Sequence, residues 1–169
     1  MKFQSQINLK QFIKLSYILY YKKALVICLT IAELIMLITS LLFYAGIALT
    51  IYKDNPPTFQ LTLGLFFVFG FPVIIYFSTR KNFAASPRLH EKIEYNFNYE
   101  NLKMTGNSFK TEFTWEKSYK IEELSQWFLI YQNKRAVNLI PKYNMTREQI
   151  IYLKAVFRKL RLPEVKLRK

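Results

Sequence analysis

The sequence is poor in the residues that enzymes and metal centres use most. One residue is histidine (His90), one is cysteine (Cys28), one is aspartate (Asp54), and four of the 169 residues are glycine. Catalytic triads, His-based metal sites and paired-aspartate magnesium sites need more of these residues than one chain holds. Four glycines also leave no room for a glycine-rich phosphate loop. The composition therefore predicts a protein that is not an enzyme and needs no cofactor or metal.

Charged residues are nearly absent from two long stretches of the chain. Segment 24–52 carries Glu33 as its only formal charge, and segment 59–79 carries none. Both stretches exceed the length of about 18 apolar residues that marks a membrane-spanning helix. We therefore predict two transmembrane helices, over 24–52 and 59–79, joined by a short external loop at 53–58.

Lysine and arginine are concentrated beside these two stretches. The N-terminal flank, 1–23, holds five lysines and no acidic residue, and linker 80–89 holds Arg80, Lys81 and Arg88. Because cytoplasmic flanks of membrane proteins carry the excess of Lys and Arg, both termini are predicted to be cytoplasmic in a multi-pass protein of the cell membrane.

The N-terminal flank is predicted to fold beside the membrane. Residues 3–7 are short and alternating, and Asn8 is a suitable N-cap for a helix that begins at Leu9. Such a juxtamembrane strand and helix would lie at, or enter, the bilayer surface.

After residue 89 the pattern changes to short segments in which apolar and polar residues alternate. That period of two is typical of half-buried strands, and the unbroken apolar run 127–131 suits a central strand. Thr146, with Gln149 three residues later, forms a capping box that starts an amphipathic helix. Segment 90–169 is thus predicted to be a cytoplasmic domain of about six antiparallel strands and one helix. The strands are 93–97, 102–104, 109–115, 119–121, 127–131 and 137–140.

The order of these elements resembles the YcxB-like family of bacterial membrane proteins. The matching residues are the strand pair 93–97 and 102–104 with the Gly106 turn, Trp115, the aromatic run 127–131, and Ile140-Pro141-Lys142 before the Thr146 helix start. The resemblance implies a two-helix transmembrane hairpin in a bacterial cell membrane. It also implies that the small, mostly β domain with its C-terminal helix is like a pleckstrin-homology (PH) domain. It implies no catalytic residue.

Basic residues are concentrated at the C-terminal end. From residue 142 onward the chain holds nine Lys and Arg against two Glu, and this excess of seven is half of the net charge of +14. Lys154, Arg158, Lys159 and Arg161 are candidate contacts for anionic lipid of the inner leaflet or for an acidic partner. The alternative is a solvated helix face that only follows the charge bias of cytoplasmic segments. Nucleic acid is not expected as a partner, because no recognition motif accompanies the charge.

Three further residues are candidates for specific contacts. Glu33 is an ionisable group inside a predicted span, where such groups are costly and usually face protein or water. It could form a proton or ion site, fix a dimer, or be a protonated acid that is hydrogen-bonded within the helix pair. Trp115 and Trp127 could anchor a protein partner, or they could belong to the core of the domain.

These observations favour a non-enzymatic binding or adaptor protein that presents a PH-like domain at the inner leaflet to a protein or lipid partner. The protein partner could be another membrane protein, and the exposed edge of a small sheet could bind it by strand addition. One alternative is immunity or resistance to a membrane-active peptide or toxin, by analogy alone. The other is small-solute transport by a homo-oligomer built around Glu33.

Overall fold

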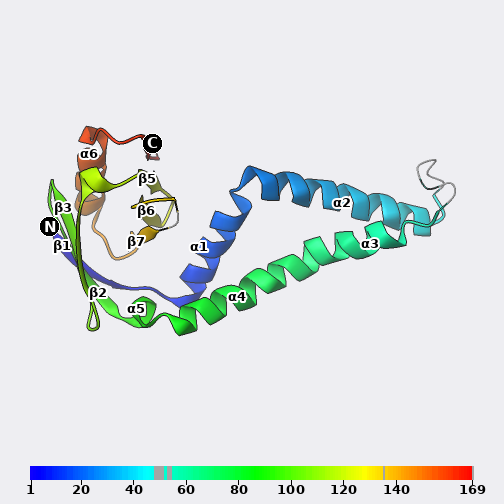
Figure 1. Ribbon diagram of the computed structural model, residues 1–169, viewed down its shortest axis with the longest axis horizontal. Coiled ribbons are helices and arrows are strands. Elements are labelled where there is room, and N and C mark those ends of the chain that lie inside the picture. The colour runs from blue at the N-terminus through cyan, green and yellow to red at the C-terminus, as the bar shows by residue number, and fades with distance from the viewer. Residues whose placement is uncertain (48–51, 53–54, 135, 169) are drawn as a thin grey trace. The chain divides into compact units, whose positions relative to one another are not determined.

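The computed structural model describes residues 1–47, 52, 55–134 and 136–168, and the chain divides into two compact units (Figure 1). The β unit comprises Met1–Ile7 and Pro87–Lys169, and the helical unit comprises Asn8–Ser86. The β unit thus takes residues from both sides of the helical unit. This differs from the prediction that residues 1–7 belong to a separate N-terminal segment.

The first sheet of the β unit contains four antiparallel strands in the order β1-β2-β3-β4. They are β1 (Lys2–Gln6), β2 (Lys92–Phe97), β3 (Asn101–Thr105) and β4 (Lys110–Thr114). Phe3 lies opposite Tyr95 in the register, and their rings stack 4.8 Å apart on the inner face. On the outer face Lys103 pairs with Glu112 at 3.3 Å. The alternation of apolar and polar residues therefore gives this sheet one buried and one solvated face.

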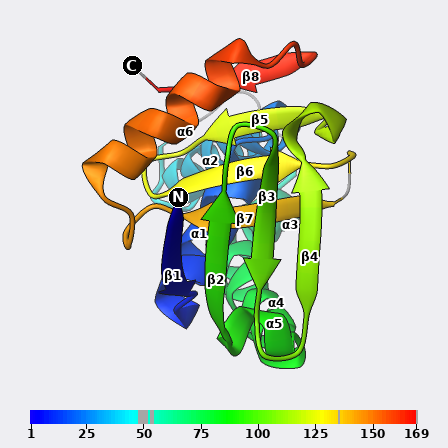
Figure 2. The same ribbon diagram turned by 90° about the vertical axis from the view of Figure 1, so that its left-hand side faces the viewer.

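The second sheet has the order β7-β6-β5-β8, with β8 parallel to β5 and the other pairs antiparallel. Its strands are β5 (Lys120–Glu123), β6 (Trp127–Tyr131), β7 (Val137–Pro141) and β8 (Glu164–Lys166). A 3₁₀ turn, η3 (Trp115–Lys117), joins the two sheets. Figure 2 shows the strands of the two sheets crossing one another, with α6 (Arg147–Lys159) running past the end of the sandwich. Two sheets and a C-terminal helix confirm the mostly β architecture predicted for this region.

The core of the β unit is aromatic and lies between the sheets and α6. Phe157 on α6 contacts Trp115 edge-on at 5.2 Å and Phe128 edge-on at 5.4 Å, and all three side chains are fully buried. Leu153 and Val156 come from the same face of the helix. Helix α6 therefore fills the opening that the two sheets leave.

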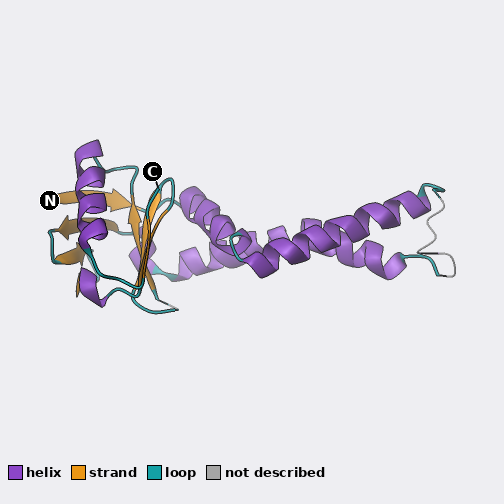
Figure 3. Cartoon of the chain, turned by 90° about the horizontal axis from the view of Figure 1, so that it is seen from above, coloured by secondary structure: helices purple, strands orange, loops and turns teal. Residues whose placement is uncertain are grey.

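The helical unit contains α1 (Leu9–Tyr21), α2 (Ala24–Tyr44), α3 (Thr58–Leu65), the π-helix η2 (Phe66–Gly70) and α4 (Phe71–Ala85), drawn as helices in Figure 3. The helix α1 begins at Leu9 as predicted, because Asn8 and Gln11 form a capping box. Two helices, Ala24–Tyr44 and Thr58–Ala85, are long and apolar enough to cross a membrane.

The bounds of these two helices differ from the prediction. The first helix ends at Tyr44, and the chain turns at Gly46 with a φ of 84°, a conformation that favours glycine. The remainder of the predicted span, 48–51, and loop residues 53–54 lie outside the described residues. The second helix continues to Ala85, because no glycine or proline interrupts it after Pro72.

The two long helices approach each other closely at Gly64. A Cβ atom added there would lie 2.8 Å from Leu37 Cβ and 3.2 Å from the Glu33 carbonyl oxygen. Leu37 and Ser40 are buried on the same side of α2. The missing side chain of Gly64 therefore permits the close approach of the backbones.

Candidate functional site

Residues at both ends of the helix α6 stabilise it. Thr146 Oγ1 accepts a hydrogen bond from the Gln149 amide, and Gln149 Oε1 accepts one from the Thr146 amide. Arg158 and Lys159 lie in the last turn, where positive charge complements the helix dipole. The capping box and the charged last turn therefore fix a helix that carries its basic residues at its C-terminal end.

Three basic residues with exposed side chains lie at and just after the end of α6, and a fourth follows β8. We call Arg158, Lys159, Arg161 and Arg168 the basic surface. Lys159 and Arg161 line one hollow of about 380 Å³, and Arg158 and Arg168 line a second of about 430 Å³. Leu160 and Leu162 line both hollows. The surface thus offers positive groups around an apolar floor, a chemistry that suits an amphipathic anion.

An exposed tyrosine extends this surface. The Lys159 ammonium lies 5.8 Å from the ring centre of Tyr99, and that ring packs 4.9 Å from the ring of Tyr152. Tyrosine beside basic side chains is typical of surfaces that meet lipid headgroups. Glu116 is the acidic residue that lines one of the hollows.

Lys154 does not join the basic surface, which differs from the prediction. Its Nζ lies 3.1 Å from Glu123 Oε2 and donates a hydrogen bond to the Arg168 carbonyl oxygen at 2.9 Å. Glu123 also pairs with Lys142 Nζ at 2.6 Å through its other oxygen. Lys154 therefore ties α6 to β5 and to the C-terminal segment, and its ammonium group is engaged in these contacts.

The Glu123 carboxylate is buried among these partners. Burial alone would raise the pKa of Glu123, but the hydrogen bonds donated by Lys142, the Arg168 amide and Lys154 outweigh it. The pKa of Glu123 is consequently held below its ordinary value, so the group is a charged structural anchor near neutral pH.

The two tryptophans are buried, which favours the core over partner anchoring among the two roles predicted for them. Trp115 has no exposed surface, and its indole N–H donates to the Asn98 carbonyl oxygen at 3.0 Å. Trp127 is 2% exposed and meets the Tyr143 ring edge-on at 5.9 Å. In this structure neither indole offers a surface that a partner could contact.

Glu33 lies within the helix pair and is 8% exposed. Its Oε2 atom is buried and has no hydrogen-bond partner within the described residues. The neighbouring polar groups are used locally, since Thr30 and Ser40 donate to the Val26 and Met36 carbonyl oxygens of their own helix. Among the described residues, Glu33 Oε2 is therefore bonded to neither of these hydroxyl groups.

Sequence reasoning found three members of the basic surface and missed Tyr99 and Arg168. Tyr99 lies in the turn between β2 and β3, so only the fold brings it to α6. Across the described part of the chain, no group of three or more His, Cys, Asp or Glu side chains could hold a metal ion. No family model, curated protein or solved structure significantly matches the chain.

Proposed function

We propose that this chain is a non-enzymatic, membrane-anchored binding protein whose β unit engages anionic lipid of the inner leaflet through the basic surface. The observation that carries the proposal is the set of four exposed cations around the apolar floor of Leu160 and Leu162. An anionic phospholipid fits this pattern, because its headgroup pairs with Lys and Arg and its glycerol and acyl region meets the leucines.

The helical unit supports anchoring in a membrane. Within the helices Ala24–Tyr44 and Thr58–Ala85 most apolar side chains are exposed, which is costly in water and favourable in lipid. The excess of Lys and Arg in the flanks favours the cytoplasmic side for both ends of the hairpin.

The pairing of β1 with β2 supports the placement of both ends of the hairpin on one side of the membrane. β1 precedes the helical unit and β2 follows it, yet Lys2 to Gln6 pair with Asn96 to Lys92 in one antiparallel ladder. Strands of one sheet must lie on the same side of a membrane. A hairpin that spans twice meets this requirement, because it returns the chain to the side from which it started.

The proposal includes a PH-like fold and kinship with the YcxB-like family. Two packed four-stranded sheets with a C-terminal helix across their open end support the first. The hairpin followed by these strands supports the second.

Native mass spectrometry of the full chain tests the lipid preference. The protein would be released from micelles containing equal amounts of phosphatidylglycerol and phosphatidylcholine, and the bound lipids counted. We expect phosphatidylglycerol to be favoured, and the triple variant Arg158→Gln, Lys159→Gln, Arg161→Gln to lose about tenfold or more of this preference, because each basic residue near an anionic surface contributes about 1 kcal/mol.

A matched control removes three charges elsewhere on the β unit. Lys2, Lys92 and Lys110 are exposed on the outer side of the first sheet, and their replacement by Gln should leave the preference unchanged. Equal loss in both triple variants would mean that net charge, not the basic surface, sets the preference. The triple variant of the basic surface could instead keep the lipid preference but lose a protein that crosslinks in cells to wild type and to the control variant. The ligand of the basic surface would then be that protein and not lipid.

A further inference from the structure

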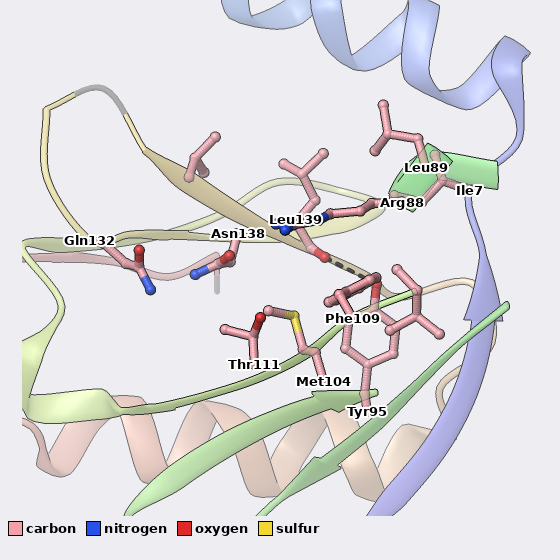
Figure 4. A pocket seen from close by; sticks show the side chains of 12 residues that line it. Ile7, Arg88, Leu89, Tyr95, Met104, Phe109, Thr111, Gln132, Asn138 and Leu139 are labelled. Atoms are coloured by element: carbon pink, nitrogen blue, oxygen red, sulfur yellow. Dashed lines mark hydrogen bonds between the residues drawn. The ribbon is translucent and has the colours of Figure 1, made fainter. Parts of the chain in front are cut away.

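A cavity of about 310 Å³ lies in the β unit between the inner faces of the two sheets (Figure 4). Ile93 and Met104 line it from the first sheet, Leu139 from β7, and Arg88 from the short helix α5 (Pro87–His90). Its volume falls at the lower end of the range of about 300–1,000 Å³ that is usual for small-molecule sites. None of the residues that line it belongs to the basic surface.

The cavity is lined by a polar residue, Asn138, at a position whose neighbour across the strands is apolar. Asn138 lies opposite Ile130 in the β6–β7 ladder, so both side chains point to the same face, and Ile130 belongs to the buried core. The Asn138 Nδ2 atom is buried and has no hydrogen-bond partner within the described residues. A buried amide donor left without a partner costs about 1–3 kcal/mol.

Other inward polar groups of this region have partners or access to solvent. Burial raises the pKa of Tyr95, so its hydroxyl stays protonated and donates to the Leu139 carbonyl oxygen at 3.3 Å. Thr111 and Gln132 line the cavity beside Asn138 in Figure 4. The Asn138 amide is thus a hydrogen-bond donor in the cavity, and this donor lacks an acceptor among the described residues.

Arg88 brings a positive charge to the same cavity. Its guanidinium carbon lies 5.1 Å from the ring centre of Phe109, and its side chain extends from α5 toward β7 (Figure 4). The carboxylate of Glu91, which follows α5, already accepts a hydrogen bond from the Ser108 amide at 2.9 Å. Hydrogen bonds from Ser108 and, to a smaller extent, the charge of Arg88 lower the pKa of this carboxylate, and the exposed guanidinium can also pair with an incoming anion.

We propose that the cavity binds a monocarboxylate with an apolar chain, in the class of medium-chain fatty acids. The chain packs against Ile93, Met104 and Leu139, and the carboxylate pairs with Arg88 and accepts the hydrogen bond that the Asn138 amide otherwise lacks. This site does not depend on the lipid binding proposed for the basic surface, so each proposal can fail without the other.

Photocrosslinking of the full chain in nanodiscs tests the site. The probe is decanoate that carries a diazirine in its chain, and the labelled peptides are identified by mass spectrometry. We expect labelling within 88–111 and 132–139 that excess decanoate suppresses and that decanol, with the same chain and no charge, does not. Equal suppression by decanol would overturn the carboxylate requirement, and labelling spread evenly over the chain would overturn the site.

Two variants separate a binding role from a structural one. Arg88→Gln should reduce specific labelling about tenfold, the effect of losing one charged hydrogen bond, while Arg147→Gln, an exposed control in the same unit, should not. Asn138→Leu should also reduce labelling, yet raise the midpoint of thermal unfolding of the ligand-free chain, because it removes an unpartnered buried amide. Full labelling by both variants, or a lower midpoint for Asn138→Leu with labelling retained, would overturn the proposal.

Discussion

The β unit and the helical unit place the same kinds of residue in opposite positions. In the β unit the fully buried side chains are large and apolar, and they include Trp115, Phe128 and Phe157. In the helical unit many large apolar side chains point outward, and Leu25 and Phe59 are each 72% exposed. The buried positions of the helices include polar or small residues, namely Glu33, Ser40, Thr79 and Gly64.

This difference shows that the two units are stabilised by different forces. Removal of apolar surface from water, worth about 25 cal/mol per Å², accounts for the packing of the β unit. The same force cannot hold helices whose apolar side chains face outward in the folded state. Close backbone approach and helix–helix packing must hold the helical unit, as in proteins whose solvent is lipid.

The largest expected effect comes from emptying the core of the β unit. Phe157→Ala removes the ring that touches Trp115 and Phe128, and we expect it to lower the free energy of unfolding by about 3–5 kcal/mol. Urea unfolding followed by tryptophan fluorescence measures this, because both tryptophans of the chain lie in the β unit.

The matched control is the same substitution in the helical unit. Phe69 is 63% exposed in η2, so Phe69→Ala should change the unfolding of the β unit by no more than about 0.5 kcal/mol. If the two variants were equally destabilised, the contrast between the units would be wrong.

A smaller effect is expected from Glu123, a carboxylate that the β unit buries between two lysines. Glu123→Gln leaves Lys142 and Lys154 without their counter-charge, and we expect a loss of about 2–3 kcal/mol near pH 7. Because the pKa of Glu123 is lowered by folding, its contribution is complete above the ordinary value of 4.5 and is lost as pH falls through the lower folded value. The difference between wild type and variant should therefore shrink below about pH 4.5.

The control for this prediction is an ion pair on the solvated face. Glu112→Gln breaks the exposed pair with Lys103 and should cost less than about 1 kcal/mol. A difference between wild type and Glu123→Gln that stays constant between pH 7 and pH 3 would contradict the role assigned to the carboxylate.

Local patterns in the sequence were enough to predict the helix α6 and most strands, but not the pairing of the strands. The capping box at Thr146 and the alternating residues are local signals, and the structure confirms both. The partner of β1 lies about 90 residues away, beyond the helical unit, and no local signal specifies such a contact. For the same reason β8, which follows Pro163 and pairs with β5, was not predicted.

Only part of the candidate site could be predicted from the sequence, namely the basic residues whose exposure follows from their position on the helix. Arg158, Lys159 and Arg161 are exposed as expected of basic residues at the end of an amphipathic helix. Lys154 lies one turn before Arg158, yet it turns to Glu123 on β5, a residue that only the fold brings near. The roles of Trp115 and Asn138 depend in the same way on contacts between strands that are distant in the sequence.

The smallest expected effect tests how the helical unit is held together. Gly64→Leu places a side chain where even a Cβ atom would lie 2.8 Å from Leu37 Cβ, so the helices must move apart, at a cost of about 1–3 kcal/mol. Spin labels at the exposed positions Leu34 and Leu65, each replaced by Cys in a Cys28→Ser chain, measure the separation by pulsed electron paramagnetic resonance. We expect longer and broader distances than in the labelled parent.

Gly70→Leu is the matched control, because the nearest neighbour of a Cβ there is the Phe66 ring of the same long helix, at 3.0 Å. That ring is 46% exposed and can turn aside, so the distance between the labels should not change. If Gly64→Leu also left the distance unchanged, backbone approach at Gly64 would not determine the packing of the helices. Their association would then depend on the side chains around Leu37 and Ser40. The helical unit would in that case be held by side-chain packing, as the β unit is.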